Sequence, residues 1–288
     1  MDRSIIAVIG GDARQIALAN MLASEGNTVY CSGFEHTAQQ LVGTASTDPI
    51  TAAHMADIVI LPMPPTRDGK NLNAPLSRYC IQLDGDFCSA LCGKEVFTGM
   101  AEKLRKVSSD FAQLNLIDYG ASEAFLQRNA QATAEGALAE IITHYPRTVC
   151  GSRILITGCG RISCFLAPML RALGGEVSVA SRKSGDRAKT AAMGMEAMSF
   201  SIASRKARNF GLIINTVPAP VVDYRFIEGV SDDVVFLELA SSPGGIDLDA
   251  CKKRNLRVIS APGLPGKYSP LSAAEAVKET VMSILEED

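Results

Sequence analysis

The sequence is poor in the residues that build metal centres. It has three histidines in 288 residues, and its eight cysteines are scattered without a C-x-x-C pair. Cys88 and Cys92 have the spacing of one helix face, but no second cysteine or histidine pair lies nearby in the sequence to complete a zinc site. We therefore expect no metal.

Charge and hydropathy argue against two further classes of partner. Lys and Arg number 28 against 31 Asp and Glu, so the strong positive field that nucleic acid or an anionic membrane requires is missing. No apolar run approaches the roughly 20 residues of a membrane helix. Gly10 and Asp12 interrupt the N-terminal apolar run too early for a signal peptide. We expect a cytoplasmic protein with reduced cysteines and, from its length, two domains.

Two segments of the chain follow the same pattern. Residues 5–9 and 153–157 are apolar runs rich in β-branched residues, and each is followed by a glycine turn and a helical stretch. This order opens a doubly wound unit. The predicted fold class is therefore α/β, with two tandem Rossmann-like domains that have doubly wound parallel sheets and are joined by a long helix.

Further elements fit this alternation. Strands are expected at residues 28–31, 58–61, 95–98 and 116–118, and again at 176–180, 212–215, 234–239 and 257–260. Helices are expected at 104–114, at about 131–143 as the bridge, and at 270–285 after a Pro/Gly-rich loop at 261–266. By fold-level analogy the last helix returns to the first domain. The predicted domains are 1–128 with 268–288, and 129–267.

The second glycine turn has the features of a dinucleotide loop. Gly158-x-Gly160-x-x-Ser163 lies between a predicted strand and helix. Gly158 permits the tight turn, and Gly160 lets the backbone approach a pyrophosphate at the helix N-terminus, with Arg161 and Ile162 beside it. Serine at the third position is small enough for close helix–strand packing.

The end of the following strand indicates which cofactor is bound. NAD sites place Asp or Glu about 20 residues after the first glycine, to bind the ribose hydroxyls. This chain has Ser181, Arg182 and Lys183 there, which suits a 2′-phosphate. The residues predict NADP, and a solvated basic turn is the alternative.

Two loops after buried strands are expected to flank the nicotinamide, because ligands of open α/β sheets bind at the carboxyl ends of strands. They contain Asn215, Thr216, Val217 and Pro218, and Leu239, Ala240 and Ser241. Ordinary Pro/Gly turns are the alternative reading.

The first glycine turn differs from the second. Asp12 would place a negative charge where a phosphate should lie, while Arg14 offers a clamp for a carboxylate. We therefore interpret residues 1–128 as the substrate domain and residues 129–267 as the NADP-binding domain.

Several segments together resemble one family, the A subunits of dipicolinate synthase. They are residues 6–15 (IAVIGGDARQ), 61–69 (LPMPPTRDG), 133–136 (TAEG), 239–245 (LASSPGG) and 261–270 (APGLPGKYSP). The resemblance spans nearly the whole chain, and GGDARQ and APGLPGK are its specific motifs. Ser163 departs from the glycine that the family often has.

The resemblance implies an enzyme that forms dipicolinate in the mother cell of a sporulating bacterium. Its substrate would be 4-hydroxy-tetrahydrodipicolinate, a cyclic product of the lysine pathway, which loses water and passes a hydride to NADP⁺. The implied partner is the flavoprotein-like B subunit of dipicolinate synthase. The oligomeric state stays open, a homo-oligomer included.

A dicarboxylate substrate needs cations, and acid–base chemistry needs a proton donor and acceptor. Arg14, Arg67 and Lys267 are the candidate carboxylate ligands, with Asp12 beside them, in loops expected to face the interdomain cleft. The candidates for proton transfer, by position only, are Asp68, Glu135 and Tyr268.

Three alternative functions stay open. A D-2-hydroxyacid dehydrogenase shares the tandem architecture but needs a C-terminal histidine, and none follows His144. A shikimate-dehydrogenase-like NADP reductase fits the Ser-Arg-Lys loop but not the GGDARQ segment. A catalytically silent NADP-binding protein that regulates a partner is the third.

Overall fold

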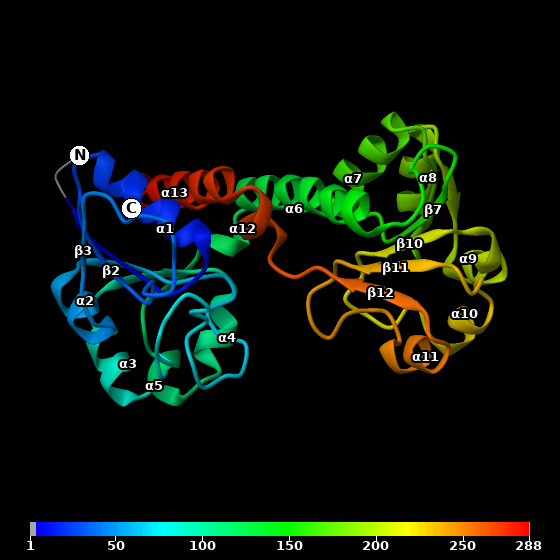
Figure 1. The fold of residues 1–288 in the computed structure, drawn as a ribbon. Helices are drawn as coiled ribbons and strands as arrows, with labels where there is room; N and C mark the ends of the chain where they lie inside the picture. Colours follow the sequence, from blue (N-terminus) through cyan, green and yellow to red (C-terminus); the bar gives the residue numbers. More distant parts are fainter. Residues whose placement is uncertain (1–3, 288) are drawn as a thin grey trace. The chain divides into compact units, whose positions relative to one another are not determined.

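The computed structural model describes residues 4–287, which form two compact units. Unit 1 ends at Asn129 and resumes at Pro265, and unit 2 is Ala130–Leu264. The sequence placed these divisions at 128/129 and 267/268. In Figure 1, unit 1 carries the blue, cyan and red segments, and unit 2 the segments from green to orange.

Unit 1 is built on a six-stranded parallel sheet with the order β3-β2-β1-β4-β5-β6. The strands are β1 (Ile5–Ile9), β2 (Thr28–Ser32), β3 (Thr44–Ser46), β4 (Ile58–Ile60), β5 (Glu95–Thr98) and β6 (Leu116–Asp118). The central strands read as apolar runs because helices cover both faces of a parallel sheet, and Val8, Val59 and Ile60 are fully buried.

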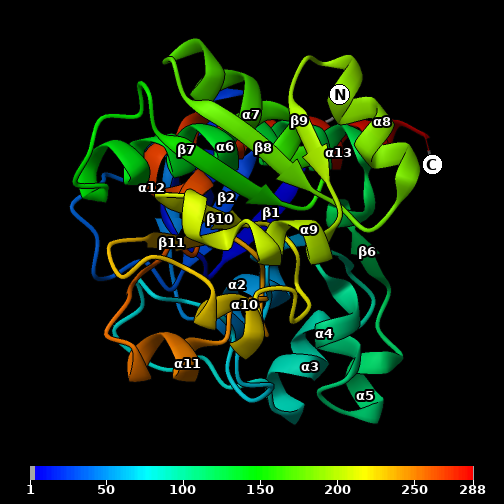
Figure 2. The same cartoon turned by 90° about the vertical axis from the view of Figure 1, so that its right-hand side faces the viewer.

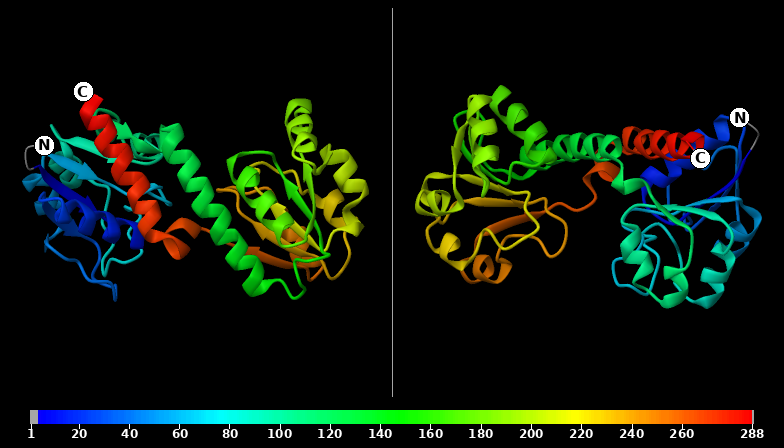
Figure 3. Two further views of the ribbon diagram at one scale, coloured as in Figure 1. Left: turned by 90° about the horizontal axis from the view of Figure 1, so that it is seen from above. Right: turned by 180° about the vertical axis from the view of Figure 1, so that it is seen from behind.

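The helices of unit 1 are short except at its termini. They are α1 (Ala13–Ser24), α2 (Pro49–Met55), α3 (Gly85–Leu91), α4 (Ala101–Arg105), α5 (Ser109–Ala112), the 3₁₀ turn η1 (Tyr119–Ala121) and α13 (Pro270–Glu287). Helix α13 lies beside α1 (Figures 1 and 3), where Ala274 and Val277 join the core of Leu18 and Leu22. The C-terminal segment is therefore part of the first unit.

Unit 2 repeats the same sheet topology. Its order is β12-β11-β10-β7-β8-β9, all parallel, and Figure 2 shows β7, β8 and β9 side by side. The strands are β7 (Arg153–Thr157), β8 (Glu176–Ala180), β9 (Glu196–Met198), β10 (Leu212–Asn215), β11 (Val235–Glu238) and β12 (Arg257–Ser260). The predicted fold class, two tandem doubly wound parallel sheets, is confirmed.

One long helix is shared by the two units. Helix α6 (Glu123–His144) begins in unit 1 and continues into unit 2, where Ala134, Ala137 and Ile141 are buried. The other helical segments from β7 onward are α7 (Arg161–Ala172), α8 (Ser184–Ala192), α9 (Phe200–Arg205), η2 (Ala207–Asn209), α10 (Tyr224–Glu228), α11 (Leu248–Lys253) and α12 (Leu264–Tyr268). No helix among residues 4–287 has the length and apolar character to cross a membrane.

Two local predictions were wrong, and two edge strands were missed. The helix expected at 104–114 is two short helices, because the Ser108 hydroxyl accepts a hydrogen bond from the Phe111 N–H and starts α5 anew. The loop expected at 261–266 contains the start of α12. The edge strands β3 and β9, with three residues each, were missed because Thr-Ala-Ser and Glu-Ala-Met carry little β-branched or aromatic character.

Candidate functional site

The turn between β7 and α7 has room for a ligand only in front of Gly160. Gly158 has a φ of +94°, and a Cβ there would lie 2.6 Å from Thr216 Oγ1, so glycine is required. A Cβ on Gly160 would meet nothing within 4 Å, and Gly160 caps α7 without a side-chain hydrogen bond. Ser163 is buried. The N-terminus of α7 is therefore approachable by an anion.

The loop after β8 presents two exposed cations. Arg182 and Lys183 are exposed, whereas Ser181 is buried and donates its hydroxyl to Asp186 Oδ2 at 2.7 Å. Arg187 Nη1 donates to the carbonyls of Ser181 and Arg182, at 3.0 and 2.7 Å. Sequence reasoning missed Arg187, which fixes the loop backbone and adds positive charge. In the sequence, only the position of Arg187 in the first turns of the following helix could have indicated this role.

A buried amide connects the ends of neighbouring strands. Asn215, the last residue of β10, is fully buried. Its Oδ1 accepts from Thr157 Oγ1 at 2.6 Å and from the Val217 N–H at 3.1 Å. The Thr216 hydroxyl donates to the Thr157 carbonyl at 2.7 Å. The turn at 215–217 is thus tied to the end of β7, beside the glycine loop, rather than being an unconstrained turn.

Glu238, at the end of β11, holds the next loop. Its Oε1 accepts from Asn215 Nδ2 at 2.7 Å and from the Ala240 N–H at 2.9 Å. Its Oε2 accepts from the N–H groups of Gly245 and Ile246 at 2.9 and 3.1 Å. Sequence reasoning missed this role. A carboxylate that ends a buried strand, seven residues before Gly245, was the available signal.

These observations place the predicted cofactor residues at one edge of the unit 2 sheet. They follow β7, β8, β10 and β11, whose carboxyl ends meet at the same edge because the strands are parallel. Residues 216–218 and 239–241 are half-buried or exposed, and so are Arg161 and Ile162. The edge therefore offers backbone donors, hydroxyls and cations to a ligand.

In unit 1, Arg14 is already paired. Its Nε and Nη2 donate to the two carboxylate oxygens of Asp12, at 2.8 and 2.9 Å, and Nη2 also reaches the Met63 carbonyl at 3.2 Å. Burial works to lower the pKa of Arg14, but the contact with Asp12 outweighs it and the pKa is raised. Asp12 also starts α1 by accepting from the Arg14 N–H. The bidentate edge of the Arg14 guanidinium, which the sequence predicted to bind a substrate carboxylate, is occupied by Asp12.

The two specific sequence motifs meet in unit 1. Gly266 lies against Asp12: a Cβ on Gly266 would be 2.5 Å from Asp12 Oδ2. Lys267 and Tyr268 follow on α12 and are exposed, with Lys267 Nζ 4.8 Å from the centre of the Tyr268 ring. The end of the chain thus brings a cation and a phenol close to the first glycine turn.

The other unit 1 candidates lie in one tight turn. Asp68 Oδ1 accepts from the N–H groups of Lys70 and Asn71, both at 2.8 Å, and its Oδ2 accepts from Asn71 Nδ2 at 2.7 Å. These bonds hold the pKa of Asp68 far below its ordinary value, so it is a poor proton donor at neutral pH. Arg67 is exposed and donates through Nε to Asn73 Oδ1 at 3.1 Å.

Glu135 belongs to the unit 2 part of α6, where it is exposed and accepts a hydrogen bond from Gln131 Nε2 at 3.2 Å.

Among residues 4–287, no three His, Cys, Asp or Glu side chains gather as a metal site would require.

Comparison with known proteins covers nearly the full chain. Residues 5–120 match the family model for the N-terminal domain of the dipicolinate synthase A subunit. The dipicolinate synthase A subunit of Bacillus subtilis (strain 168) is 27% identical over 287 residues, which are 98% of this chain and 96% of that protein. The crystal structure of the A subunit from Bacillus halodurans superposes with a TM-score of 0.86 at 26% identity, over 98% of each chain.

More distant structures share the fold alone. A transhydrogenase from Sinorhizobium meliloti matches with a TM-score of 0.70 at 14% identity, over 98% of this chain and 93% of that one. The family match of residues 5–120 and the similarity over nearly the full length lead to one conclusion: this chain is similar, in sequence and in fold, to the A subunits of dipicolinate synthase.

Proposed function

We propose that this chain is an NADP-dependent oxidoreductase that forms dipicolinate from 4-hydroxy-tetrahydrodipicolinate. The substrate loses one water, and it also loses two electrons and two protons, of which one proton leaves with the electrons as a hydride. Similarity over 98% of the chain to a protein named as the A subunit of dipicolinate synthase supports this reaction. The observation that carries it in the structure is the open glycine turn at Gly160, next to a basic loop.

The residues of unit 2 fit a dinucleotide with a 2′-phosphate. The pyrophosphate would lie on the α7 N-terminus at Gly158 and Gly160, and the 2′-phosphate on Arg182 and Lys183. Neither Arg182 nor Lys183 has a carboxylate partner among the described residues, so both can bind phosphate. NADP, when bound, supplies the hydride acceptor. The loops held by Asn215 and Glu238 would border the nicotinamide.

Unit 1 would bind the dicarboxylate. Arg67 and Lys267 are exposed cations, and a bidentate arginine matches a carboxylate in geometry. Arg14 would act through the Asp12 pair and keep the first glycine turn in place, because that pair occupies its Nε and Nη2. Tyr268 is the better candidate for proton transfer in this unit, since Asp68 is committed to its turn.

The proposed setting follows the relatives. Their designation as A subunits implies a companion, and the flavoprotein-like B subunit of dipicolinate synthase is the proposed partner. The proposed location is the cytoplasm of the mother cell during sporulation.

A second function has one observation in its favour. Asp12 pairs with Arg14, and Asp68 with its own turn, so two predicted substrate-site groups are already engaged. A catalytically silent NADP-binding protein would need neither group for chemistry.

One experiment separates the two functions. The purified chain is mixed with NADP⁺ and enzymatically generated substrate, with and without the B subunit, and NADPH absorbance and dipicolinate are followed. Gly160→Val serves as the control, because the new side chain meets no protein atom within 4 Å at its Cβ and would obstruct only a bound pyrophosphate. NADP binding without turnover under either condition would favour the silent NADP-binding protein. Equal NADP binding by Gly160→Val would refute the assigned cofactor site.

A further inference from the structure

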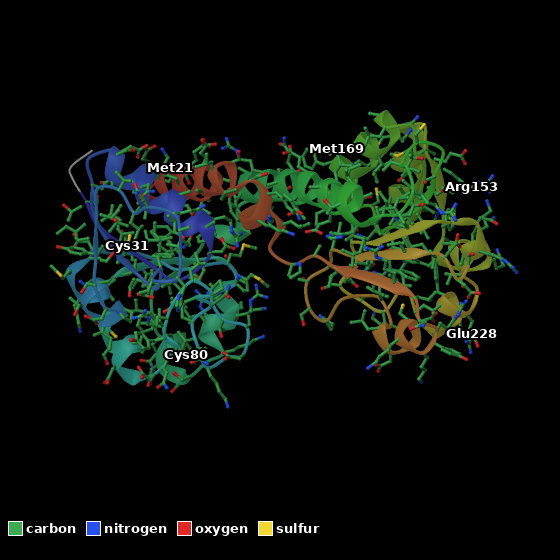
Figure 4. All side chains as sticks on the ribbon, viewed as in Figure 1. Met21, Cys31, Cys80, Arg153, Met169 and Glu228 are labelled. Atoms are coloured by element: carbon green, nitrogen blue, oxygen red, sulfur yellow. The ribbon has the colours of Figure 1, made fainter. Side chains whose placement is uncertain are left out.

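A cavity of about 570 Å³ lies in unit 1, and every residue that lines it belongs to that unit. This volume is in the range of roughly 300–1,000 Å³ that is typical of small-molecule sites. Its wall includes Ser32 and Ser46, the last residues of β2 and β3. Figure 4 labels Cys31, near the end of β2, and Cys80, another residue of the wall. The cavity is thus at the carboxyl edge of a parallel sheet, where ligands of this fold bind.

The position corresponds to that of the basic loop in unit 2. The two sheets have the same strand order, so β2 of unit 1 matches β8 of unit 2. Three residues beyond the end of β8 stands Lys183, and three residues beyond the end of β2 stands Glu35. A carboxylate at this place in a nucleotide-binding sheet accepts hydrogen bonds from ribose hydroxyls. Glu35 lines the cavity.

The glycine turn of unit 1 has no room for phosphate. A Cβ on Gly10 would lie 2.8 Å from Leu72 Cδ2, so residue 72 already covers the turn. The Gly11 N–H, which could otherwise bind an anion, donates to the Asn73 carbonyl at 2.8 Å. The Asp12 side chain, paired with Arg14, already occupies the N-terminus of α1. A ligand in the adjacent cavity therefore cannot place a phosphate on this turn.

The charge and the apolar surface of the cavity wall restrict the chemical class of the ligand further. The wall contains three carboxylates, Glu35, Asp48 and Asp84, and none of the described wall residues is Lys or Arg. Asp48 and Asp84 are fixed as the N-caps of α2 and α3. Such a wall repels phosphates and the dicarboxylate substrate alike. Buried Ile81 and Phe87 and the exposed ring of Tyr79 add apolar surface that suits a flat base.

Glu35 keeps acceptor capacity for a ligand. Its Oε1 accepts from the Gly33 N–H at 3.3 Å and its Oε2 from the Arg78 N–H at 3.0 Å. The Glu35 N–H and the Ser77 hydroxyl also lie at this carboxylate, and the Ser77 hydroxyl can rotate away, so a ribose hydroxyl would take its place on Glu35. We propose that this cavity binds a nucleoside without phosphates, with its ribose hydroxyls on Glu35 and its base against the apolar wall. The site is separate from the cofactor site of unit 2.

Calorimetry with adenosine as the probe tests this. The protein is first saturated with NADP, so that the proposed cofactor site is filled, and adenosine and adenosine 5′-monophosphate are then titrated separately. We expect saturable binding of adenosine and binding of the monophosphate weaker by about tenfold or more, because the carboxylates repel its phosphate.

Three variants connect the signal to this cavity. Glu35→Gln should weaken adenosine binding by about tenfold or more, since a charged acceptor is lost. Ser46→Phe should abolish it by filling the cavity, and Glu286→Gln, on α13, should leave it unchanged. Thermal denaturation confirms that each variant is folded. Ser46→Phe keeps the test decisive if Glu35→Gln does not fold, because Ser46 makes no hydrogen bond through its hydroxyl among the described residues.

Three results would overturn the assignment: no saturable adenosine binding, equal affinity for the monophosphate, or unchanged affinity in a folded Glu35→Gln or Ser46→Phe variant. Adenosine that binds only without NADP would belong to unit 2. Failure of NADP itself to bind would refute the proposed cofactor and leave the comparison among the unit 1 variants intact.

Discussion

The Glu238 carboxylate accepts four hydrogen bonds at the carboxyl edge of the unit 2 sheet, so its neutral isostere makes a sharp test. In Glu238→Gln one oxygen becomes an NH₂ group, which cannot accept hydrogen bonds. Either the N–H groups of Gly245 and Ile246, or Asn215 Nδ2 and the Ala240 N–H, then face another donor.

The magnitude follows from those contacts. A hydrogen bond to a charged group is worth about 1.5–3 kcal/mol, and two of the four are lost. Because Glu238 is only half-buried and water can reach the loop, we expect a loss of about 2–4 kcal/mol in the free energy of unfolding. That is a large share of the ordinary stability of about 5–15 kcal/mol. Cofactor affinity should fall as well, since the loop at 239–246 loses its anchor.

Chemical denaturation measures the stability, and hydrogen exchange at the amides of Gly245 and Ile246 reports on the loop itself. Glu228→Gln is the matched control: Glu228, labelled in Figure 4, is an exposed carboxylate on α10 of the same unit, and it accepts a hydrogen bond from Tyr224. It should change stability by less than about 0.5 kcal/mol. Wild-type stability together with wild-type amide protection in Glu238→Gln would refute the reasoning.

Three further outcomes are expected. Arg182→Ala should weaken NADP binding by about 1.5–3 kcal/mol and leave NAD binding unchanged, because only the 2′-phosphate contact is lost; equal loss for both cofactors in titrations would contradict this. Arg67→Ala should lower kcat/KM by about 30- to 1000-fold with NADP affinity unchanged. Arg67 is preferred to Arg14 for this test because Arg14→Ala would leave Asp12 unpaired; near-normal turnover would place the substrate elsewhere. Asp68→Asn should leave the pH profile of activity unchanged, because the lowered pKa of Asp68 keeps it ionised at neutral pH. The stabilisation of the fold by the ionised Asp68 is complete above about pH 4 and is lost only as the pH falls further, towards the folded-state pKa. A displaced acid limb would show that Asp68 titrates in the reaction after all.

The architecture of the two sheets is readable from the residues alone. Strands such as β5, β6, β8, β10 and β12 have the bounds that their residues predicted, because each contains the β-branched or other apolar residues that favour a strand. The glycine turns were equally readable, since a positive φ at Gly158 excludes other residues. The GGDARQ and APGLPGK motifs are enough to indicate the family.

Which side chains are available to a ligand depends on the folded chain. Arg14 and Asp12 are two residues apart, yet their pairing depends on how the Arg14 side chain folds back and on the Met63 carbonyl, 49 residues away. Gly266 reaches Asp12 from the far end of the chain. In the sequence, Glu238 is recognisable only as the last residue of a strand. In the structure, the N–H groups of a loop seven and eight residues later donate hydrogen bonds to its carboxylate. Local sequence patterns indicate secondary-structure propensity and burial, whereas hydrogen bonds between distant segments form only when the chain has folded.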